Sequence, residues 1–150
     1  MSDESVRSFE KFALAFEESF AANDWSAVEA CATDDVVWVV AGAPPPIGGA
    51  WEGREKTLGA IRASVDGFDR RFDLREPRAL EEPTPIPGGG VHLRWVVVYR
   101  RDGLPPLELH GEEWDFFRDG KLEFHRERIA NAGEVIDFLT KHGEKLRPPR

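Results

Sequence analysis

The sequence predicts an α+β fold, in which helices lie against one face of a strongly bent, mostly antiparallel sheet. Helical spacing of apolar residues dominates residues 6–32 and 53–65, whereas alternating β-branched and aromatic residues dominate residues 91–129. The resulting order is helix, helix, strand, helix and then a block of strands, which is typical of helices collected on one sheet face. A bent sheet wrapped around its helices leaves a conical pocket between the layers, so we expect any functional site there.

The composition indicates a single globular domain. The chain has 150 residues, of which 41% are hydrophobic, and this suffices for one sizeable core. We place the domain at residues 1–150, with its core at about residues 5–130. A net charge of −8 without any Lys/Arg cluster argues against a nucleic-acid partner. Without a long apolar segment we expect neither a signal peptide nor a membrane partner. The single Cys31 excludes an internal disulfide and predicts a reducing, cytoplasmic environment.

Apolar spacing predicts four helices. The first is amphipathic with an aromatic inner face, formed by Val6, Phe9, Phe12, Ala13, Phe16 and Phe20. Asp24 is placed to accept backbone N–H bonds as the N-cap of a short second helix that ends near Ala32. A third helix starts at Gly53, and a short C-terminal helix is expected at about residues 134–142.

Runs of β-branched and aromatic residues predict five strands. Residues 36–41 form a strand with little solvent exposure, and a second is expected from Phe68 towards Leu80, where apolar and polar residues alternate. Three longer strands follow at residues 91–101, 107–117 and 122–129, and the turns between them contain Asp-Gly pairs. Consecutive strands of this kind form an antiparallel meander.

Two segments rich in Pro and Gly are expected as loops, because proline removes backbone donors and glycine permits unusual dihedrals. They are residues 42–53 and residues 81–90. Residues 42–50 are a candidate gate over the mouth of the pocket, since function often depends on shaped loops.

Three stretches, taken in order, resemble a known superfamily. They are FALAFEESFAANDWSAVEACATDDVVWVVAG, GGAWEGREKTLGAI and EEWDFFRDGKLEFHRERI. Together they are similar to the nuclear-transport-factor-2-like (NTF2-like, cystatin-like) fold, and within it to the SnoaL-like proteins, over residues 5–129. The resemblance implies a cone-shaped domain, commonly a homodimer packed through its sheet, with a cavity for small, mainly apolar molecules. Members include polyketide cyclases, ketosteroid isomerases, limonene epoxide hydrolases and non-catalytic binding domains, so the fold alone does not choose a reaction.

Glu127 and His125 are the candidate catalytic residues. The segment KLEFHRERI resembles the last strand of the epoxide hydrolases, where a carboxylate acts as general acid, and Glu127 has that position. Burial in an apolar cone raises the pKa of a carboxyl group, which suits general acid–base catalysis near neutral pH. His125 falls on the same strand face as Glu127, where it could relay a proton. Alternatively, Glu127 pairs with Arg94, Arg126 or Arg128 on a solvated face, and His125 is only a hydrogen-bond partner.

Other positions depart from the reactions of this superfamily. The epoxide hydrolases need an arginine and an aspartate where Trp95 and Val97 stand, and a tyrosine and an asparagine where Trp38 and Val40 stand. Limonene-type epoxide hydrolysis is therefore disfavoured. The ketosteroid isomerase scheme needs a tyrosine donor, a base on the first strand and a protonated acid, and only Tyr99 is present in the chain.

Several further residues are candidates for binding a ring-shaped ligand. Some of the tryptophans Trp38, Trp51, Trp95 and Trp114 could form an aromatic pocket, with Val97 as a further lining residue, or could pack in the core or a dimer interface instead. Glu113 and Asp115 alternate with Glu112 and Trp114 on the middle strand, so one pair of acids shares a face with Gly111. If that face is concave, Glu113 could approach Glu127 and form a carboxyl pair with separated pKa values.

We expect no metal and no cofactor. His92, His110 and His125 lie one on each meander strand, but no close pair such as His-x-His fixes two ligands.

The leading hypothesis is a SnoaL-like protein that binds a small apolar or ring-shaped molecule, and that acts as a cofactor-independent isomerase, cyclase or hydrolase through Glu127 with His125. The alternatives are a non-catalytic ligand-binding or dimerisation domain, and a protein-association module with a filled cone and an exposed apolar patch.

Overall fold

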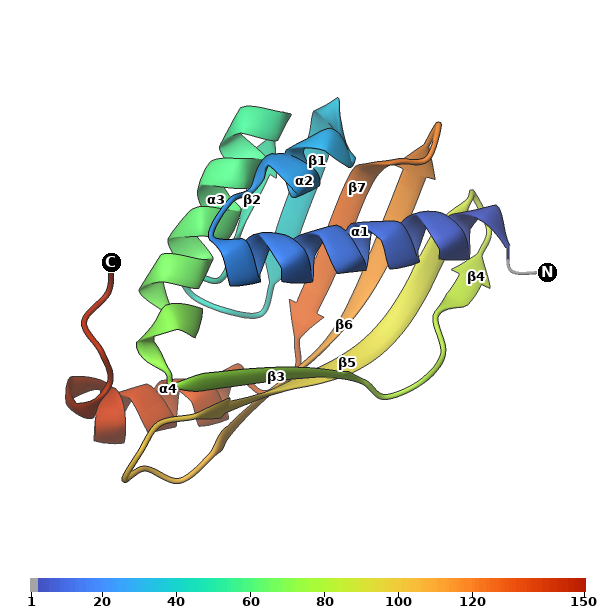
Figure 1. Ribbon diagram of the computed structural model, residues 1–150. Coiled ribbons are helices and arrows are strands. Elements are labelled where there is room, and N and C mark those ends of the chain that lie inside the picture. Colours follow the sequence, from blue (N-terminus) through green and yellow to red (C-terminus); the bar gives the residue numbers. More distant parts are fainter. Residues whose placement is uncertain (1–2) are drawn as a thin grey trace.

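The computed structural model describes residues 3–150 and shows a bent sheet with helices against one face (Figure 1). The helices are α1 (Glu4–Ala22), α2 (Ser26–Ala30), α3 (Arg54–Gly67) and α4 (Ala132–His142), with the short 3-10 helices η1 (Asp69–Arg71) and η2 (Gly143–Lys145). The strands are β1 (Ala32–Ala41), β2 (Gly49–Glu52), β3 (Leu74–Ala79), β4 (Thr84–Ile86), β5 (Gly90–Arg100), β6 (Leu107–Arg118) and β7 (Lys121–Ile129). The predicted α+β fold is confirmed.

The sheet has the order β2-β1-β7-β6-β5-β3, and β4 pairs with β5. β1 runs parallel to β7, while all the other strand pairs among the described residues are antiparallel. α1 crosses one face of the sheet and α3 lies near β1 and β2 (Figure 1). Phe12 of α1 reaches Trp38 of β1, with ring centroids 6.3 Å apart. The hydrophobic core and the cavity described below therefore lie between these helices and the sheet.

α1 forms where its apolar spacing predicts it. Asp3 caps the first turn by accepting the backbone N–H of Ser5 at 2.8 Å. Asn23 ends the helix in the left-handed conformation at φ 53°. Phe9 and Phe12 are buried on the inner face, so this helix contributes aromatic rings to the space that it covers.

A shift in strand register decides which residues of β7 face inwards. Phe116 pairs with Phe124 and Phe117 with Leu122, so Glu123 is an extra residue in the ladder. Leu122 and His125 are consequently both buried, although they are three positions apart. Beyond the shift, simple alternation resumes.

Some element boundaries differ from the sequence predictions. The strand expected from Phe68 towards Leu80 is wrong in its first part, because residues 69–71 form η1 and β3 begins at Leu74. The N–H groups of Arg71 and Phe72 bond back to Phe68 and Asp69, so this backbone forms a local turn. The turn gathers the rings of Phe68 and Phe72 against Tyr99.

The two predicted loops each contain a short strand. β2 pairs with β1, and β4 pairs with β5, so both segments extend the sheet. Pro85 lies in β4, a three-residue strand that is paired on one side only, where a missing backbone donor costs little. β1 also starts at Ala32 and not at residue 36.

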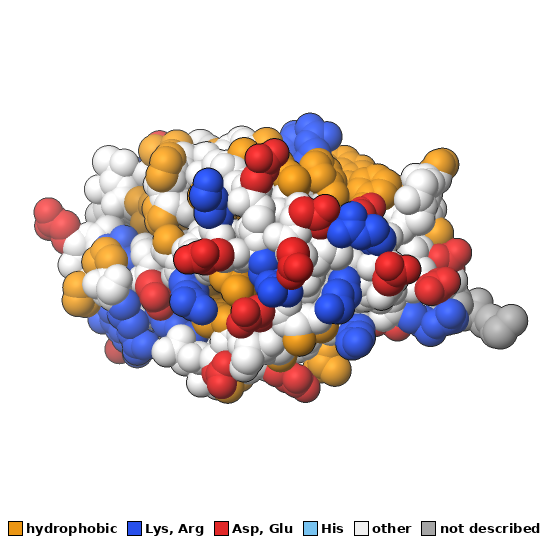
Figure 2. Space-filling view, turned by 90° about the horizontal axis from the view of Figure 1, so that it is seen from above, with side chains coloured by type: hydrophobic (Ala, Val, Ile, Leu, Met, Phe, Trp, Pro, Cys, Tyr) orange, Lys and Arg blue, Asp and Glu red, His pale blue; other side chains and the backbone are white. Residues whose placement is uncertain are grey.

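α4 packs its apolar side onto the same core. Val135 and Phe138 are buried, and the ring of Phe138 lies 6.0 Å from that of Phe72. No helix formed by the described residues is long and apolar enough to cross a membrane. On the face shown in Figure 2, basic and acidic side chains are interspersed.

Candidate functional site

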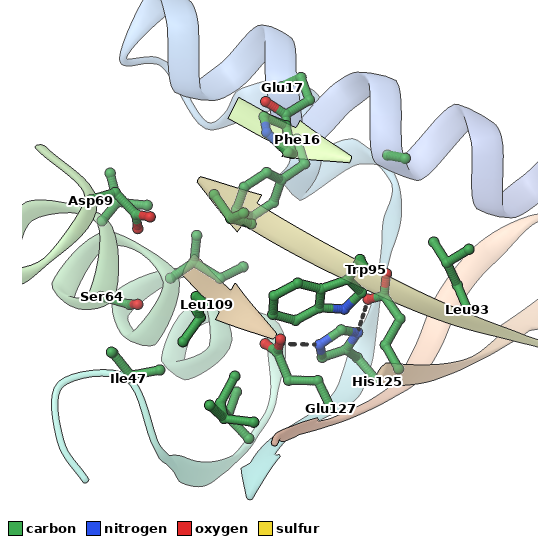
Figure 3. Close-up of a pocket in the computed structure, with 18 of the residues that line it drawn as sticks. Phe16, Glu17, Ile47, Ser64, Asp69, Leu93, Trp95, Leu109, His125 and Glu127 are labelled. Carbon is green, nitrogen blue, oxygen red and sulfur yellow. Dashed lines mark hydrogen bonds and ion pairs between the residues drawn. The ribbon is translucent and has the colours of Figure 1, made fainter. Parts of the chain in front are cut away.

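A cavity of about 380 Å³ lies between α1, α3 and the concave face of the sheet (Figure 3). Most of its wall is apolar. Polar groups enter it mainly from β6 and β7 on one side and from η1 and β3 on the other. The size and the few polar groups are typical of a small-molecule site.

Seven of the residues singled out in the sequence come together in this cavity. They line its wall: Trp38, Trp51, Trp95, Val97, Glu113, His125 and Glu127. Ile47, from the candidate gate at residues 42–50, lines it as well. The fourth tryptophan named for an aromatic pocket, Trp114, is not among the residues that line the cavity, and the guanidinium of Arg126 lies over its ring at 5.1 Å from the centroid.

His125 is held on three sides. Its Nδ1 lies 2.5 Å from Oδ1 of Asp115, and its Nε2 lies 3.3 Å from Oε1 of Glu127. The imidazole stacks on the indole of Trp38, with centroids 3.7 Å apart and an angle of 20°. Asp115 is the direct partner of His125 across the β6–β7 ladder, and Glu113 is paired with Glu127 two residues further along. Strand pairing alone therefore assembles the cluster, since side chains of paired residues lie on the same face.

The two carboxylates beside His125 favour its charged form. Burial of the imidazole opposes the charge, but Asp115 and then Glu127 hold the pKa of His125 well above its usual range. In the resulting imidazolium, Nδ1 donates to Asp115 and Nε2 donates to Glu127. A charged imidazole stacked on tryptophan also gains a cation–π interaction.

Glu113, unlike His125, favours its neutral form. Burial and the negative charge of Asp115 raise the pKa of Glu113 well above its usual range, and Glu127 adds to this effect, while His125 opposes it. The raised pKa therefore favours the form of Glu113 that carries a proton. That proton can be donated to Asp115, whose Oδ2 is buried and has no other hydrogen-bond partner among the described residues. The cluster thus combines a neutral acid with a carboxylate bound to an imidazolium.

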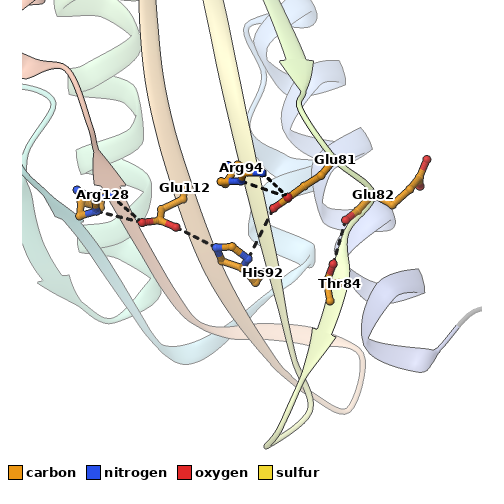
Figure 4. Close-up of polar contacts among 7 residues, drawn as sticks. All are labelled: Glu81, Glu82, Thr84, His92, Arg94, Glu112 and Arg128. Carbon is orange, nitrogen blue, oxygen red and sulfur yellow. Dashed lines mark hydrogen bonds and ion pairs between the residues drawn. The ribbon is translucent and has the colours of Figure 1, made fainter.

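The alternative placement of Glu127 on a solvated sheet face is wrong. Its side chain is 18% exposed and faces the cavity. The arginines proposed as its partners have other contacts: Arg128 donates to Glu112 at 2.8 Å, and Arg94 donates to Glu81 at 2.9 Å (Figure 4). Arg128 lies on the outer face, because the side chains of β7 point to alternate faces beyond its register shift. Arg94 lies on that face too, since it pairs with Glu112 and Glu112 pairs with Arg128.

A second polar group enters the cavity from η1 and β3, and the sequence interpretation missed it. The hydroxyl of Tyr99 donates to Asp69. Nε of Arg75 lies 3.4 Å from Asp69, and its Nη1 donates to Glu17 at 2.8 Å. Burial raises the pKa of Asp69, although Arg75 and Tyr99 oppose the shift and Glu127 adds to it. Burial next to Asp69 also raises the pKa of Tyr99 well above its usual range.

The sequence identified Asp115 in part and Asp69 not at all. Strand alternation places Asp115 on the face of Glu113, but its contact with His125 was not predicted. Asp69 could not be found in this way, because the segment from Phe68 to Phe72 imitates a strand pattern and forms a turn instead.

One group of described residues could hold a metal ion, namely Glu113, Asp115 and His125, whose possible ligand atoms lie within 4.8 Å of one another. A separation of 2.5 Å between His125 and Asp115 suits a shared proton, whereas tetrahedral zinc at about 2.0–2.1 Å holds its ligands further apart. The three histidines of the meander do not converge, because His92 contacts Glu112 and His110 contacts Glu108.

Comparison with known proteins identifies the architecture. No protein-family model and no curated protein sequence matches the chain. Solved structures do match. An NTF2-like protein from Burkholderia xenovorans LB400 is 17% identical, with a TM-score of 0.63 over 91% of this chain and 96% of that chain. The chain has the NTF2-like fold.

Two other solved structures with the NTF2-like fold have names that suggest a reaction. An LEH-like epoxide hydrolase from M. tuberculosis is 15% identical, with a TM-score of 0.63 over 92% of this chain and 90% of that chain. A candidate SnoaL-like polyketide cyclase from Jannaschia sp. CCS1 is 15% identical, with a TM-score of 0.65 over 91% and 93%. These similarities establish the NTF2-like fold, and the chemistry must be argued from the cavity.

Proposed function

We propose that the protein is a small-molecule enzyme that transfers protons by general acid–base catalysis, with Glu127 as the base. The single observation that carries this proposal is the chain of contacts from buried Asp115 through His125 to Glu127 at the wall of an apolar cavity. Asp115 and Trp38 fix His125, and His125 in turn fixes the carboxylate. Such positioning removes the need to orient the base during the reaction.

The proposed step is removal of a proton from a carbon next to a carbonyl group. The C–H bond breaks, its proton moves to Glu127, and its electron pair moves towards the carbonyl oxygen. Glu127 keeps the proton that it removed, and Glu113, whose raised pKa favours its protonated form, can give its own proton to a second position of the substrate, so the cavity holds both an acid and a base. Isomerisation and cyclisation both begin in this way, and the step itself needs no cofactor.

The names of two similar structures, an LEH-like epoxide hydrolase and a candidate SnoaL-like polyketide cyclase, support an enzymatic role for the cavity. Epoxide hydrolysis of the limonene type is less well supported. β5 turns Leu93, Trp95, Val97 and Tyr99 towards the cavity, so the expected arginine and aspartate are missing from that wall.

The same apolar strand favours one alternative function, a non-catalytic receptacle for an apolar ligand. In that case the ionisable groups would serve only to bind and orient the ligand. Proton transfer in a simple assay distinguishes the two possibilities.

The assay uses 5-nitrobenzisoxazole, whose ring opens to a coloured nitrophenolate when a base removes its carbon-bound proton and the N–O bond breaks. We expect turnover above that of acetate at equal concentration, and a loss of about 10²-fold or more in Glu127→Gln. The control is Glu123→Gln on the same strand, since Glu123 pairs with Arg118 outside the cavity. Equal rates for Glu127→Gln and the unmodified protein would favour the alternative function, non-catalytic binding of an apolar ligand.

A further inference from the structure

The charges around the cavity are unbalanced. Its wall carries the carboxyl groups of Glu17, Asp69, Glu113 and Glu127, and Asp115 lies directly behind His125. Glu17 comes from α1, Asp69 from η1 and Glu127 from β7, so these acids face the cavity from several directions (Figure 3).

The cationic groups of the wall already have partners. Arg75 donates to both carboxylate oxygens of Glu17, at 2.8 and 3.1 Å, and its Nε lies 3.4 Å from Asp69, so one cation is shared between two carboxyl groups. Arg78 contacts Glu76 at 3.3 Å, and its side chain is 58% exposed. His125 is shared between two carboxylates, as described above. Even with Glu113 neutral, the acids around the cavity outnumber the cations that face them.

Two of these carboxyl groups act on each other. Asp69 on η1 and Glu127 on β7 line the same cavity. Burial raises the pKa of Asp69, Arg75 and Tyr99 oppose the shift, and the negative charge of Glu127 adds to it. A cation in the cavity would relieve this repulsion, whereas a neutral ligand would leave it and an anion would increase it.

Aromatic rings complete the surroundings that a cation requires. Phe12, Phe16, Trp38, Trp51, Phe68 and Trp95 line the wall. Ring faces attract ammonium groups by their quadrupole, most strongly where water is excluded, and tryptophan attracts them best. Carboxylates and aromatic faces together form a site that selects an ammonium over an uncharged group of the same shape.

We infer that the ligand of this cavity is an amine or quaternary ammonium compound with an apolar ring, whose charge lies between Asp69 and Glu127. The inference rests on the proposed function in one respect, that the cavity binds the substrate, and it names the class of that substrate.

The test compares two probes of equal shape, benzyltrimethylammonium and its uncharged carbon isostere neopentylbenzene. Binding is followed by quenching of tryptophan fluorescence, because Trp38, Trp51 and Trp95 lie in the cavity wall. We expect the cation to bind at least about tenfold more tightly than the isostere. Asp69→Asn keeps an oxygen that can accept from Tyr99, so the variant is expected to fold. It should reduce the affinity for the cation several-fold and leave that for the isostere unchanged.

The matched control is Asp66→Asn, which removes one negative charge from α3 outside the cavity, where Asp66 contacts Arg70 at 3.5 Å. It should preserve the preference for the cation. Equal affinity for both probes, failure of both to bind, or a preference that survives in Asp69→Asn would each overturn the inference. The ring-opening assay is independent of these results, because its probe is uncharged. Turnover that depends on Glu127 would therefore retain the proposed function even if the substrate class were wrong.

Discussion

Glu112 and Glu113 are neighbours on β6 that point to opposite faces of the sheet. On the outer face, hydrogen bonds from His92 and Arg128 hold the pKa of Glu112 below its usual range. On the inner face, burial and Asp115 raise the pKa of Glu113 well above its usual range. The strand thus creates opposite proton affinities from one residue type, and this difference can be tested by unfolding.

We expect Glu113→Gln to stabilise the protein increasingly as the pH rises from about 5 to about 8. A raised pKa means that Glu113 contributes stability below its unfolded pKa of about 4.3, and that this stability is lost as the pH rises towards the folded pKa. Glutamine does not ionise, so the variant keeps this stability as the pH rises. Each unit of pKa difference is worth about 1.4 kcal/mol, or roughly 3 °C in Tm for a chain of this length. Thermal unfolding followed by circular dichroism at several pH values measures the trend.

Glu112→Gln is the control with the opposite sign. Because the pKa of Glu112 is lowered, its contribution is present above the unfolded pKa and is lost as the pH falls through the folded value. This variant should therefore be less stable than the unmodified protein at neutral pH and equal to it in acid. Parallel curves for the two variants would contradict the assignment of the inner and outer faces.

The buried pair of His125 and Asp115 allows a second test with single residues. We expect His125→Leu to cost about 3 kcal/mol or more in urea unfolding, because it leaves Asp115 buried with an uncompensated charge. Adding Asp115→Asn should recover part of that loss, since the charge is gone. A double variant that loses the sum of the two single effects would show that the residues do not interact.

At the scale of elements, the sequence predicted the meander well and its inner face incompletely. The long strands β5, β6 and β7 follow from alternation and from their Asp-Gly turns, and they carry most of the candidate residues. Alternation would have put Glu123 on the face of His125, and the register shift at Phe116 and Phe117 prevents this. Such a register shift depends on long-range strand pairing and twist, so no local sequence pattern predicts it.

Close packing between β5 and β6 shapes the cavity wall. Gly111 is paired with Trp95, and a Cβ atom on Gly111 would lie 2.4 Å from Cζ2 of the indole. We expect Gly111→Ala to push Trp95 towards the cavity, to cost about 1–3 kcal/mol, and to weaken binding of neopentylbenzene measured by fluorescence quenching. Gly90→Ala meets Phe116 at 2.7 Å and should cost stability without changing the affinity. Similar losses of affinity in both variants would indicate a general loosening.

For the whole molecule, the order of elements was enough to predict a cone with a pocket, because helices on one face of a bent sheet leave few other arrangements. Glu127 on β7 was identified through the resemblance of its strand to the epoxide hydrolases, and Trp38 on β1 through the suitability of tryptophan for an aromatic pocket. The polar group on η1 was not identified, because a turn brings Asp69 beside Tyr99 from 30 positions away in the chain. Contacts between distant segments are fixed by packing and not by local periodicity.

The outer sheet face bears on assembly, and the homodimer expected from the sequence remains a prediction. Trp114, Phe116 and Phe124 are only partly buried there, and the rings of Phe116 and Phe124 lie 6.1 Å apart. Charges of both signs surround them, among them Arg128 and Glu112 (Figure 4). A mixed surface of this kind can complement itself about a two-fold axis, with aromatic rings at the centre and ion pairs at the rim.

We therefore expect sedimentation velocity at micromolar concentration to give twice the chain mass of 16.9 kDa. Trp114→Glu should shift the protein to a single chain, because it places a charge in the centre of the interface. Leu14→Glu is the control, since Leu14 is 61% exposed on α1, which covers the opposite face of the sheet. A monomeric unmodified protein would refute the dimer. A dimer that is lost with Leu14→Glu and kept with Trp114→Glu would move the interface from the sheet to α1.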